Sequence, residues 1–152
     1  MLKLTSNKKL NIVVTGGSRG LGAGLVKSFS SRGNKVFMFS RNTCDVGDPI
    51  EFSKRIDEMH ENYFDNEPIH IWINNAASSG GYNRFIDMSV ESISDVIKTN
   101  VLGTIIGTKK AIEIIERQSI PGYIYNVTGA DAVNSKKSKI PSFYKMFVYQ
   151  GL

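Results

Sequence analysis

Short apolar runs alternate with longer stretches of helical periodicity along this chain, and the alternation predicts an α/β fold. Compact apolar runs, each typical of a buried strand, lie at 10–15, 35–40, 69–73 and 122–128. Between them, apolar side chains recur every three or four residues over 20–32, from 48 onward and from 89 to about 118. Strands that alternate with helices favour a parallel sheet covered by helices on both faces.

Two of the expected helices carry signals for their first residue and for their buried face. Asp48 is expected to cap a helix, with Pro49 at its first position and Glu51 completing a capping box. The stripe expected to be buried on this helix comprises Phe52, Ile56, Met59 and Tyr63. On the longer helix that starts at Ser89, the apolar side is expected to comprise Ile93, Val96, Ile97, Val101, Ile105, Ile112 and Ile115.

Length and composition indicate one ordinary globular domain. The 152 residues are enough to bury a core, so we expect a single domain over 1–152. The hydrophobic share of 41% and the charged share of 22% are typical of globular proteins. No apolar run approaches the roughly 20 residues of a membrane helix, and residues 1–9 lack a signal-peptide core. These features predict a cytoplasmic protein without a membrane partner, and the single cysteine, Cys44, agrees with a reducing compartment.

The net charge of +5 raises the question of an anionic partner. Residues from 131 onward contribute +3 of it, through Lys136, Lys137, Lys139 and Lys145 against Asp131. Because this lysine cluster has no interleaved aromatic side chains, we interpret it as a solvated loop and expect no nucleic-acid partner. His60 and His70 lack the spacing of a ligand set, so no metal site is predicted.

Glycines cluster directly after the first apolar run. The segment Thr15-Gly16-Gly17-Ser18-Arg19-Gly20-Leu21-Gly22 connects that run to the helix expected from residue 20. In such a place, Gly16 permits a tight turn, Gly20 lets the backbone approach a pyrophosphate, and Gly22 lets the helix lie close to the sheet. The first N–H groups of the helix then face an anion. The order of strand, glycine loop and helix predicts a dinucleotide site, although such glycines also serve simply to turn a loop.

The spacing Thr-Gly-x-x-x-Gly-Leu-Gly, together with three later segments, resembles the short-chain dehydrogenase/reductase family. Residues 73–77, Ile-Asn-Asn-Ala-Ala, are similar to the family's Asn-Asn-Ala-Gly after its fourth strand, with Ala77 in place of the usual glycine. Residues 98–103 are similar to the segment that carries the family's helix asparagine, and residues 123–127 to its fifth strand. The sequences at 71–75, 98–100 and 126–130 also resemble the chlorophyll b reductase branch.

The resemblance implies a Rossmann-like three-layer α/β sandwich, here with a shortened parallel sheet in the strand order two-one-four-five. The family is usually roughly a hundred residues longer, so a truncated domain is expected. Only seven residues, 41–47, separate the second strand from the Asp48 cap, whereas a parallel crossover takes about a dozen or more. The third strand and the helix before it are therefore expected to be absent or vestigial. The edges left at 36–39 and 123–127 would be pairing templates, which predicts a homo-oligomer or a bound partner.

The end of the second strand favours NADP over NAD. An NAD site places a carboxylate about 20 residues after the glycine loop, where it binds the ribose 2′-hydroxyl. This chain has Ser40-Arg41-Asn42 there, and Arg41, helped by Arg19, can grip a 2′-phosphate, unless both arginines are merely solvated. Asp45-Val46 resembles the family's pair that lies along the adenine. The expected cofactor is NADP, bound by Gly16, Ser18, Arg19, Gly20, Leu21, Gly22, Arg41, Asp45, Val46, Asn75 and Ala76.

The resemblance also implies a catalytic tetrad, which this chain matches in part. Asn100 corresponds to the asparagine that holds a water relay. Tyr144 is at a plausible place for the tyrosine acid/base, but Val148 stands where a lysine usually favours its ionised form. Gly129 stands where serine is usual, which leaves Thr128 as the nearest hydroxyl. The predicted catalytic residues are therefore Asn100, Thr128 and Tyr144, in a weakened site.

The leading hypothesis is an NADP-dependent short-chain oxidoreductase that reduces a small-molecule carbonyl substrate by hydride transfer. A second hypothesis is a pseudoenzyme or interaction module that binds the nucleotide without turnover. A third is a truncated remnant that does not fold alone. Carbonyl-dependent NADPH oxidation, cofactor binding without turnover, and failure to fold distinguish the three.

Overall fold

The computed structural model describes residues 9–81 and 85–128, and its centre is a four-stranded sheet. The strands lie in the order β2-β1-β3-β4, where β1 is Asn11–Thr15, β2 is Lys35–Phe39, β3 is Ile71–Asn74 and β4 is Tyr123–Asn126. All neighbouring pairs are parallel. The expected order two-one-four-five is confirmed, and within the described residues no strand lies outside β2.

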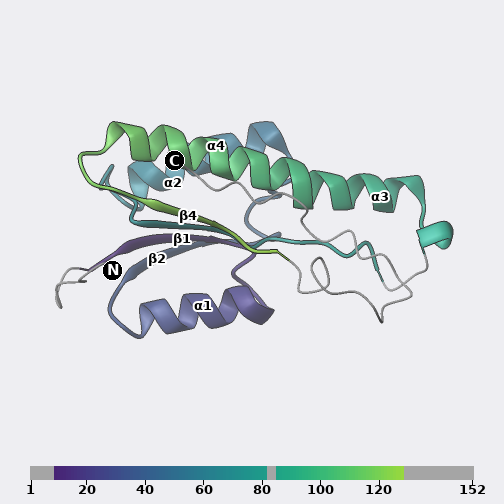
Figure 1. Cartoon of the computed structure of the whole chain (residues 1–152), viewed down its shortest axis with the longest axis horizontal. Coiled ribbons are helices and arrows are strands. Elements are labelled where there is room, and N and C mark those ends of the chain that lie inside the picture. The colour runs from purple at the N-terminus through teal and green to yellow at the C-terminus, as the bar shows by residue number, and fades with distance from the viewer. Residues whose placement is uncertain (1–8, 82–84, 129–152) are drawn as a thin grey trace.

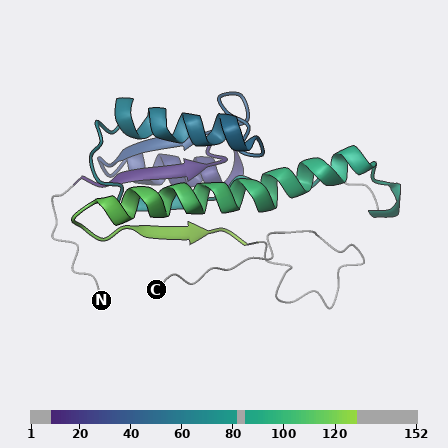
Figure 2. The ribbon, with the colours of Figure 1, turned by 90° about the horizontal axis from the view of Figure 1, so that it is seen from above.

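Helices cover both faces of the sheet and complete three layers (Figure 1). α1, Gly20–Ser30, lies on one face, and α2, Pro49–Asn62, and α4, Gly103–Arg117, lie on the other. α4 continues α3, Val90–Ile97, through the π-helical turn η2, Lys98–Leu102. Seen from above, this long helix crosses the sheet and runs past its end (Figure 2). The Rossmann-like α/β fold predicted from the sequence is therefore confirmed.

Separate apolar clusters seal the two faces of the sheet. On the α1 side, Ile12, Val14 and Ile73 pack against Leu25 and Phe29. The larger cluster on the other side is built from strand and helix residues, with the fully buried Val13, Phe52, Ile56, Phe64, Ile69 and Trp72 at its centre. Because successive side chains of β1 point to opposite faces, one strand contributes to both clusters.

Asp48 caps α2 as predicted from the sequence, but Glu51 does not complete a capping box, because the N–H of Asp48 donates to the Asp45 carbonyl at 3.1 Å instead. The Asp48 carboxylate accepts hydrogen bonds, both at 2.9 Å, from the N–H groups two and three residues further along. The expected stripe is buried at Phe52, Ile56 and Met59. Tyr63 departs from that prediction, because it follows the helix as its C-cap and is 38% exposed.

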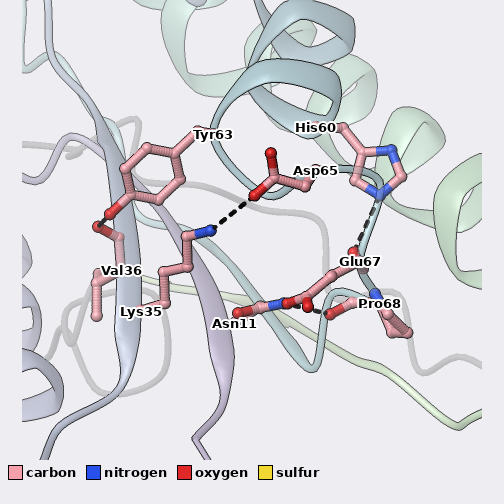
Figure 3. Close-up of polar contacts among 8 residues, drawn as sticks. All are labelled: Asn11, Lys35, Val36, His60, Tyr63, Asp65, Glu67 and Pro68. Carbon is pink, nitrogen blue, oxygen red and sulfur yellow. Dashed lines mark hydrogen bonds and ion pairs between the residues drawn. The ribbon is translucent and has the colours of Figure 1, made fainter.

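β2 is an edge strand, and Tyr63 covers part of its outer side (Figure 3). The N–H of Lys35 donates to the Leu10 carbonyl, and the carbonyl of Phe39 accepts the N–H of Gly17, so both groups face the side of β1. Main-chain direction alternates along a strand, so the N–H and carbonyl groups of Val36 and Met38 face outward. The Tyr63 hydroxyl donates to the Val36 carbonyl at 2.9 Å. Its hydroxyl needs a polar partner, which explains why this residue sits at the edge and not in the core.

Lys35 completes the cover over the first half of β2. Its ammonium pairs with the Asp65 carboxylate at 3.4 Å (Figure 3). The same ammonium lies 5.2 Å from the centre of the Tyr63 ring and 5.6 Å from that of Phe64. Phe37 and Tyr63 meet edge to face, with ring centres 5.0 Å apart. One of the two edges expected to promote self-association is thus partly covered. Self-association itself stays a prediction.

The connection from α2 to β3 is tied to β1 at the same corner (Figure 3). The Asn11 amide donates to the Glu67 carboxylate at 3.3 Å and to the next carbonyl along at 3.0 Å. A ring nitrogen of His60 lies 3.2 Å from the Glu67 carbonyl oxygen. Asp65 and Asn66 turn the chain with φ of 55° and 58°, in the left-handed region that these residue types tolerate better than most. The corner fixes the end of the sheet opposite to the glycine loop.

The long helix faces the sheet mainly with small and polar residues. Its buried positions are Val96, Thr99, Asn100, Gly103, Thr104, Gly107, Ala111 and Ile114. Ile97 and Ile105, which were expected on the buried side, are 51% and 54% exposed, so that part of the prediction is wrong. Where the helix lies closest to the sheet there is room mainly for small side chains, and Ile97 and Ile105 lie outside that contact.

A buried amide joins β3, β4 and α4. Asn74 is fully buried; its Oδ1 accepts from Trp72 Nε1 at 2.9 Å, and its Nδ2 donates to the Thr108 hydroxyl at 3.0 Å and to Asn126 Oδ1 at 2.8 Å. A Cβ added to Gly107 would collide with Asn74 Oδ1. Because three hydrogen bonds hold the amide in place, Gly107 determines how closely α4 approaches the sheet.

Replacing Gly107 by alanine should therefore destabilise the chain by about 1–3 kcal/mol, the usual range for an overpacked core. Gly24, inside α1, is the matched control, because an added Cβ there meets nothing within 4 Å. Gly24→Ala should stabilise the chain by up to about 1 kcal/mol, since alanine is preferred over glycine in a helix interior. Urea unfolding measures both changes. Equal effects of the same sign would contradict the role given to Gly107.

Candidate functional site

The glycines between β1 and α1 hold this loop close to the residues that follow β3. Gly16 has φ 68°, and a Cβ added to it would lie 2.6 Å from Ala76 Cα. A Cβ on Gly22 would fall on the carbonyl oxygen of Gly16. Gly20 also has a left-handed φ, 54°, but a Cβ there would meet nothing within 4 Å. Glycine is thus required at 16 and 22 by close packing, whereas at 20 it borders open space.

Thr15 and Asn75 lock the ends of β1 and β3 together. Thr15 Oγ1 accepts the N–H groups of Asn75 and Ala76, both at 3.0 Å. Asn75 Nδ2 donates in return to the carbonyls of Thr15 at 3.1 Å and Gly16 at 3.0 Å. Thr15 is only 2% exposed, so water cannot take the place of its hydroxyl as the acceptor for these two N–H groups. The sequence prediction missed this role, because the partners of Thr15 lie 60 and 61 positions further along the chain.

The first turn of α1 presents its N–H groups toward the same region. Within the described residues, no side chain caps this helix: Arg19 at the N-cap is extended and makes no capping hydrogen bond, and the first turn contains no acidic residue. The N-terminus of a helix carries a partial positive charge. The turn therefore offers both hydrogen-bond donors and positive potential to an anion.

The loop that leaves β2 forms the opposite wall. Arg41 and Asn42 are exposed, whereas Cys44 and Val46 are buried and anchor the loop in the core. Asp45 Oδ1 accepts the N–H of the residue two positions on at 2.9 Å. The loop thus combines rigid apolar anchors with polar side chains that project outward.

These segments enclose a cavity of about 440 Å³. All of the residues predicted to bind the cofactor line it, namely Gly16, Ser18, Arg19, Gly20, Leu21, Gly22, Arg41, Asp45, Val46, Asn75 and Ala76. Its wall also includes Phe39, Ser40, Asn42, Cys44, Ala77 and Thr99, which the sequence prediction did not name. Ser40 and Asn42 flank Arg41 in the sequence, so their place in the cavity wall could have been predicted from that of Arg41. Thr99 comes from η2, and only the folded arrangement brings it here.

Positive charge dominates the described wall of the cavity. Two guanidinium groups, on Arg19 and Arg41, stand against one carboxylate, on Asp45. That carboxylate already accepts a main-chain hydrogen bond. A cavity of this charge, next to an uncapped helix N-terminus, suits a ligand with several phosphate groups.

Burial raises the pKa of the Cys44 thiol to about 12, and the nearby carboxylate of Glu51 adds to the shift. The thiol is 2% exposed although its residue lines the cavity. It is therefore a protonated, apolar part of the wall at neutral pH and a poor nucleophile.

Of the predicted catalytic residues, Asn100 has the clearest place. It is buried in η2, where its Oδ1 accepts the N–H of Ser78 at 2.7 Å and its Nδ2 donates to the Ser78 carbonyl at 2.9 Å. Its own carbonyl accepts the Thr104 hydroxyl at 2.8 Å. The side chain thus holds the loop after β3 beside the cavity. Thr128 follows β4 and is exposed, and Tyr144 lies outside the described residues.

Metal ligation and membrane insertion find no support in the described ranges. Residues 9–81 and 85–128 contain no group of three or more His, Cys, Asp or Glu side chains that could hold a metal ion. In the same ranges, every helix is too short or too polar to cross a bilayer.

Comparison with known families decides the classification. A short-chain dehydrogenase family model, described as enoyl-(acyl carrier protein) reductase, matches residues 6–140. The chain belongs to the short-chain dehydrogenase/reductase family. The resemblance drawn from the glycine loop and the three later segments is confirmed.

Two plant proteins of this family are similar to the chain over part of their length. A probable chlorophyll(ide) b reductase NYC1 of Arabidopsis thaliana, named as chloroplastic, is 26% identical and covers 82% of this chain and 32% of its own length. Chlorophyll(ide) b reductase NOL of Oryza sativa subsp. japonica, also named as chloroplastic, is 29% identical and covers 79% and 41%. The chain thus spans roughly a third to two-fifths of the length of these relatives.

The alignment with the Arabidopsis protein is longer than the part of this chain that it covers. It runs over 160 positions but takes in 82% of the 152 residues, or about 125. About 35 positions of the relative therefore have no counterpart in this short-chain dehydrogenase/reductase chain.

Solved structures of short-chain dehydrogenases share the fold. Ligand-free aldohexose dehydrogenase of Thermoplasma acidophilum superposes with a TM-score of 0.71 at 26% identity, over 85% of this chain and 53% of that one. ElxO with NADP bound gives 0.72 at 21% identity, over 84% and 58%. A Brucella ovis oxidoreductase with a partially ordered NAD gives 0.67 at 24%, over 84% and 66%. At the two lower identities the likeness concerns the fold alone.

The state of Cys44 leads to a labelling prediction. At pH 8 the folded chain should react with a thiol reagent at least about a hundredfold more slowly than the urea-unfolded chain, because the thiol is buried and protonated. The raised pKa also predicts that stability falls as pH rises above the ordinary value near 9, where the unfolded thiol ionises first. Free cysteine serves as the rate standard. Equal labelling rates before and after unfolding would contradict the burial of this residue.

Proposed function

We propose that the cavity binds NADP(H) and that the chain is the nucleotide-binding part of an oxidoreductase that reduces a carbonyl by hydride transfer. One observation carries the proposal: the glycine loop, the uncapped start of α1 and two arginines converge on a single cavity. Family membership supplies the reaction class. The cytoplasmic location expected from the sequence stays a prediction beside the chloroplastic relatives.

The pyrophosphate would lie against the glycine loop. Gly20 borders open space, so a phosphate can approach the backbone there without meeting a side chain. The N–H groups of the first turn of α1 then act as donors in a region of positive potential. The clamp between Thr15 and Asn75 holds the loop in this shape before any ligand enters.

The 2′-phosphate would lie between Arg41 and Arg19. Both arginines line the cavity, and a guanidinium group can give paired, charge-assisted hydrogen bonds to phosphate oxygens. Asp45 and Val46, further along the same loop, would lie along the adenine, as in the family pattern. A carboxylate that would favour the free 2′-hydroxyl of NAD is absent from Ser40-Arg41-Asn42.

The nicotinamide end would lie near Asn75 and Ala76, at the exit of β3. NADPH, when bound, supplies the hydride. Asn100 contributes by fixing the Ser78 backbone, which forms part of this exit loop. Thr128, at the end of β4, and Tyr144 are proposed as the hydroxyls that orient and protonate the carbonyl.

A binding function without turnover is the second candidate, and the sequence gives it a specific basis. Gly129 and Val148 stand where the family uses a serine and a lysine. A lysine four residues after the tyrosine would favour its ionised form and so its exchange of protons, and position 148 of this chain is valine. NADPH binding together with oxidation of NADPH by an aldehyde or ketone supports the enzyme, and binding without oxidation supports the second candidate.

Replacing Arg41 by alanine tests the choice of nucleotide. The variant should bind NADPH about tenfold or more weakly and NADH almost unchanged, since a hydrogen bond to a charged group contributes about 1.5–3 kcal/mol. Titration of each nucleotide by calorimetry gives the two affinities. Arg32→Ala, an exposed arginine just after α1, is the control and should change neither. Equal losses for NADPH and NADH in Arg41→Ala would exclude a 2′-phosphate contact.

A pair of glycines tests the place of the pyrophosphate. Gly20 and Gly33 both have left-handed φ, 54° and 81°, and a Cβ on either meets nothing within 4 Å. Alanine should destabilise the chain by about 1–2 kcal/mol at both positions through the same backbone strain. Only Gly20→Ala should weaken NADPH and NADH, and to a similar extent, because only Gly20 lines the cavity. Loss of binding in Gly33→Ala as well would point to stability and not to contact.

A further inference from the structure

Thr43 closes a tight turn at the exit of β2 through contacts with a single residue, Ser40. Thr43 Oγ1 accepts the N–H of Ser40 at 3.1 Å and donates to its carbonyl at 3.0 Å. The two hydroxyl oxygens lie 3.2 Å apart. The N–H groups of Thr43 and Cys44 add two bonds to the Ser40 carbonyl, at 3.0 and 2.9 Å.

The position of Ser40 explains why a hydroxyl is needed there. Main-chain direction alternates along β2, so the N–H of Ser40 points outward, like those of Val36 and Met38. No strand lies on that side within the described residues. Ser40 is 8% exposed, so its N–H requires a protein partner, and the Thr43 hydroxyl is that partner.

The turn fixes the two residues between its ends, Arg41 and Asn42. Both are exposed and both line the cavity. The turn is anchored on each side by a buried core residue, Phe39 before it and Cys44 after it, each 2% exposed. Its backbone therefore has little freedom, and the direction in which the Arg41 side chain leaves the chain is set.

We propose that Thr43 is a positioning residue for Arg41 and thereby sets the preference for a 2′-phosphorylated nucleotide, an inference that rests on the nucleotide site proposed above. An arginine side chain loses considerable rotamer freedom when it binds a phosphate. A fixed backbone removes the further loss that a mobile loop would add on binding. Thr43 touches no ligand in this scheme; it acts through the turn.

Thr43→Val and Thr43→Ser separate the hydroxyl from the shape of the side chain. Valine keeps the volume but removes the hydroxyl, and serine keeps the hydroxyl. Affinities for NADPH and NADH, and for 2′,5′-ADP and 5′-AMP as fragments, are measured by calorimetry on the full chain. Thr43→Val should lower the affinity for NADPH and 2′,5′-ADP about fivefold, with less than about a twofold change for NADH and 5′-AMP. Thr43→Ser should stay within about twofold of the parent for all four.

Combination with Arg41→Ala shows whether the two residues act together. In that background, Thr43→Val should change the ratio of NADPH to NADH affinity by less than about twofold, because the group it positions is gone. A purely structural role would instead lower all four affinities to the same extent, which overturns the proposal. The proposal is also overturned if Thr43→Val leaves the ratio of NADPH to NADH affinity unchanged while Arg41→Ala lowers that ratio.

The test separates this inference from the proposed function. Failure of the parent chain to bind either nucleotide overturns the nucleotide site itself, and an Arg41→Ala variant with an unchanged ratio overturns the 2′-phosphate contact. If Thr43→Val does not fold by circular dichroism, Thr43→Ala replaces it, because alanine removes the same hydroxyl and the cavity wall, which does not include Thr43, keeps its residues. That variant should also lower the preference for NADPH, and an unchanged ratio in it counts against the proposal.

Discussion

With only seven residues between Ser40 and Asp48, the chain passes from β2 into α2 without room for another strand. β2 is therefore an edge of the sheet, and its outward main-chain groups need other partners. The Tyr63 hydroxyl donates to the Val36 carbonyl near one end of the strand, and the Thr43 hydroxyl accepts the N–H of Ser40 just beyond the other end. The same short link puts Arg41 and Asp45 on one loop, so a single rigid segment supplies most of one cavity wall.

The end of β3 organises the opposite wall through two consecutive asparagines. Asn74 points toward α4 and β4 and is fully buried among Trp72, Thr108 and Asn126. Asn75 points the other way and bonds to the loop after β1. Since neighbouring strand residues face opposite sides, one dipeptide serves the core and the cavity at once. Asn100 adds a third amide, which secures the backbone just beyond them.

The sequence predicted those parts of the structure that depend on local signals. The strands, the Asp48 cap, the missing strand and the glycine loop follow from residues close to one another in the chain. The roles of Thr15, Tyr63 and Thr99 depend on partners that only the fold brings near, as the 60 positions between Thr15 and Asn75 illustrate. The burial of Ile97 and Ile105 was predicted wrongly. Hydrophobicity alone does not reveal that glycine, alanine and threonine occupy the positions where the helix packs closely on the sheet.

The hydroxyl caps on β2 have a consequence for how such a sheet changes over evolutionary time. A unit removed from the edge of a parallel sheet breaks main-chain pairing along one strand only and leaves the ladders between the remaining strands intact. A single excision of a strand and its helix can then be tolerated if a few side chains nearby already carry hydroxyl groups. In this chain, Tyr63 and Thr43 supply such hydroxyl groups to the outward-facing main chain of β2 and Ser40.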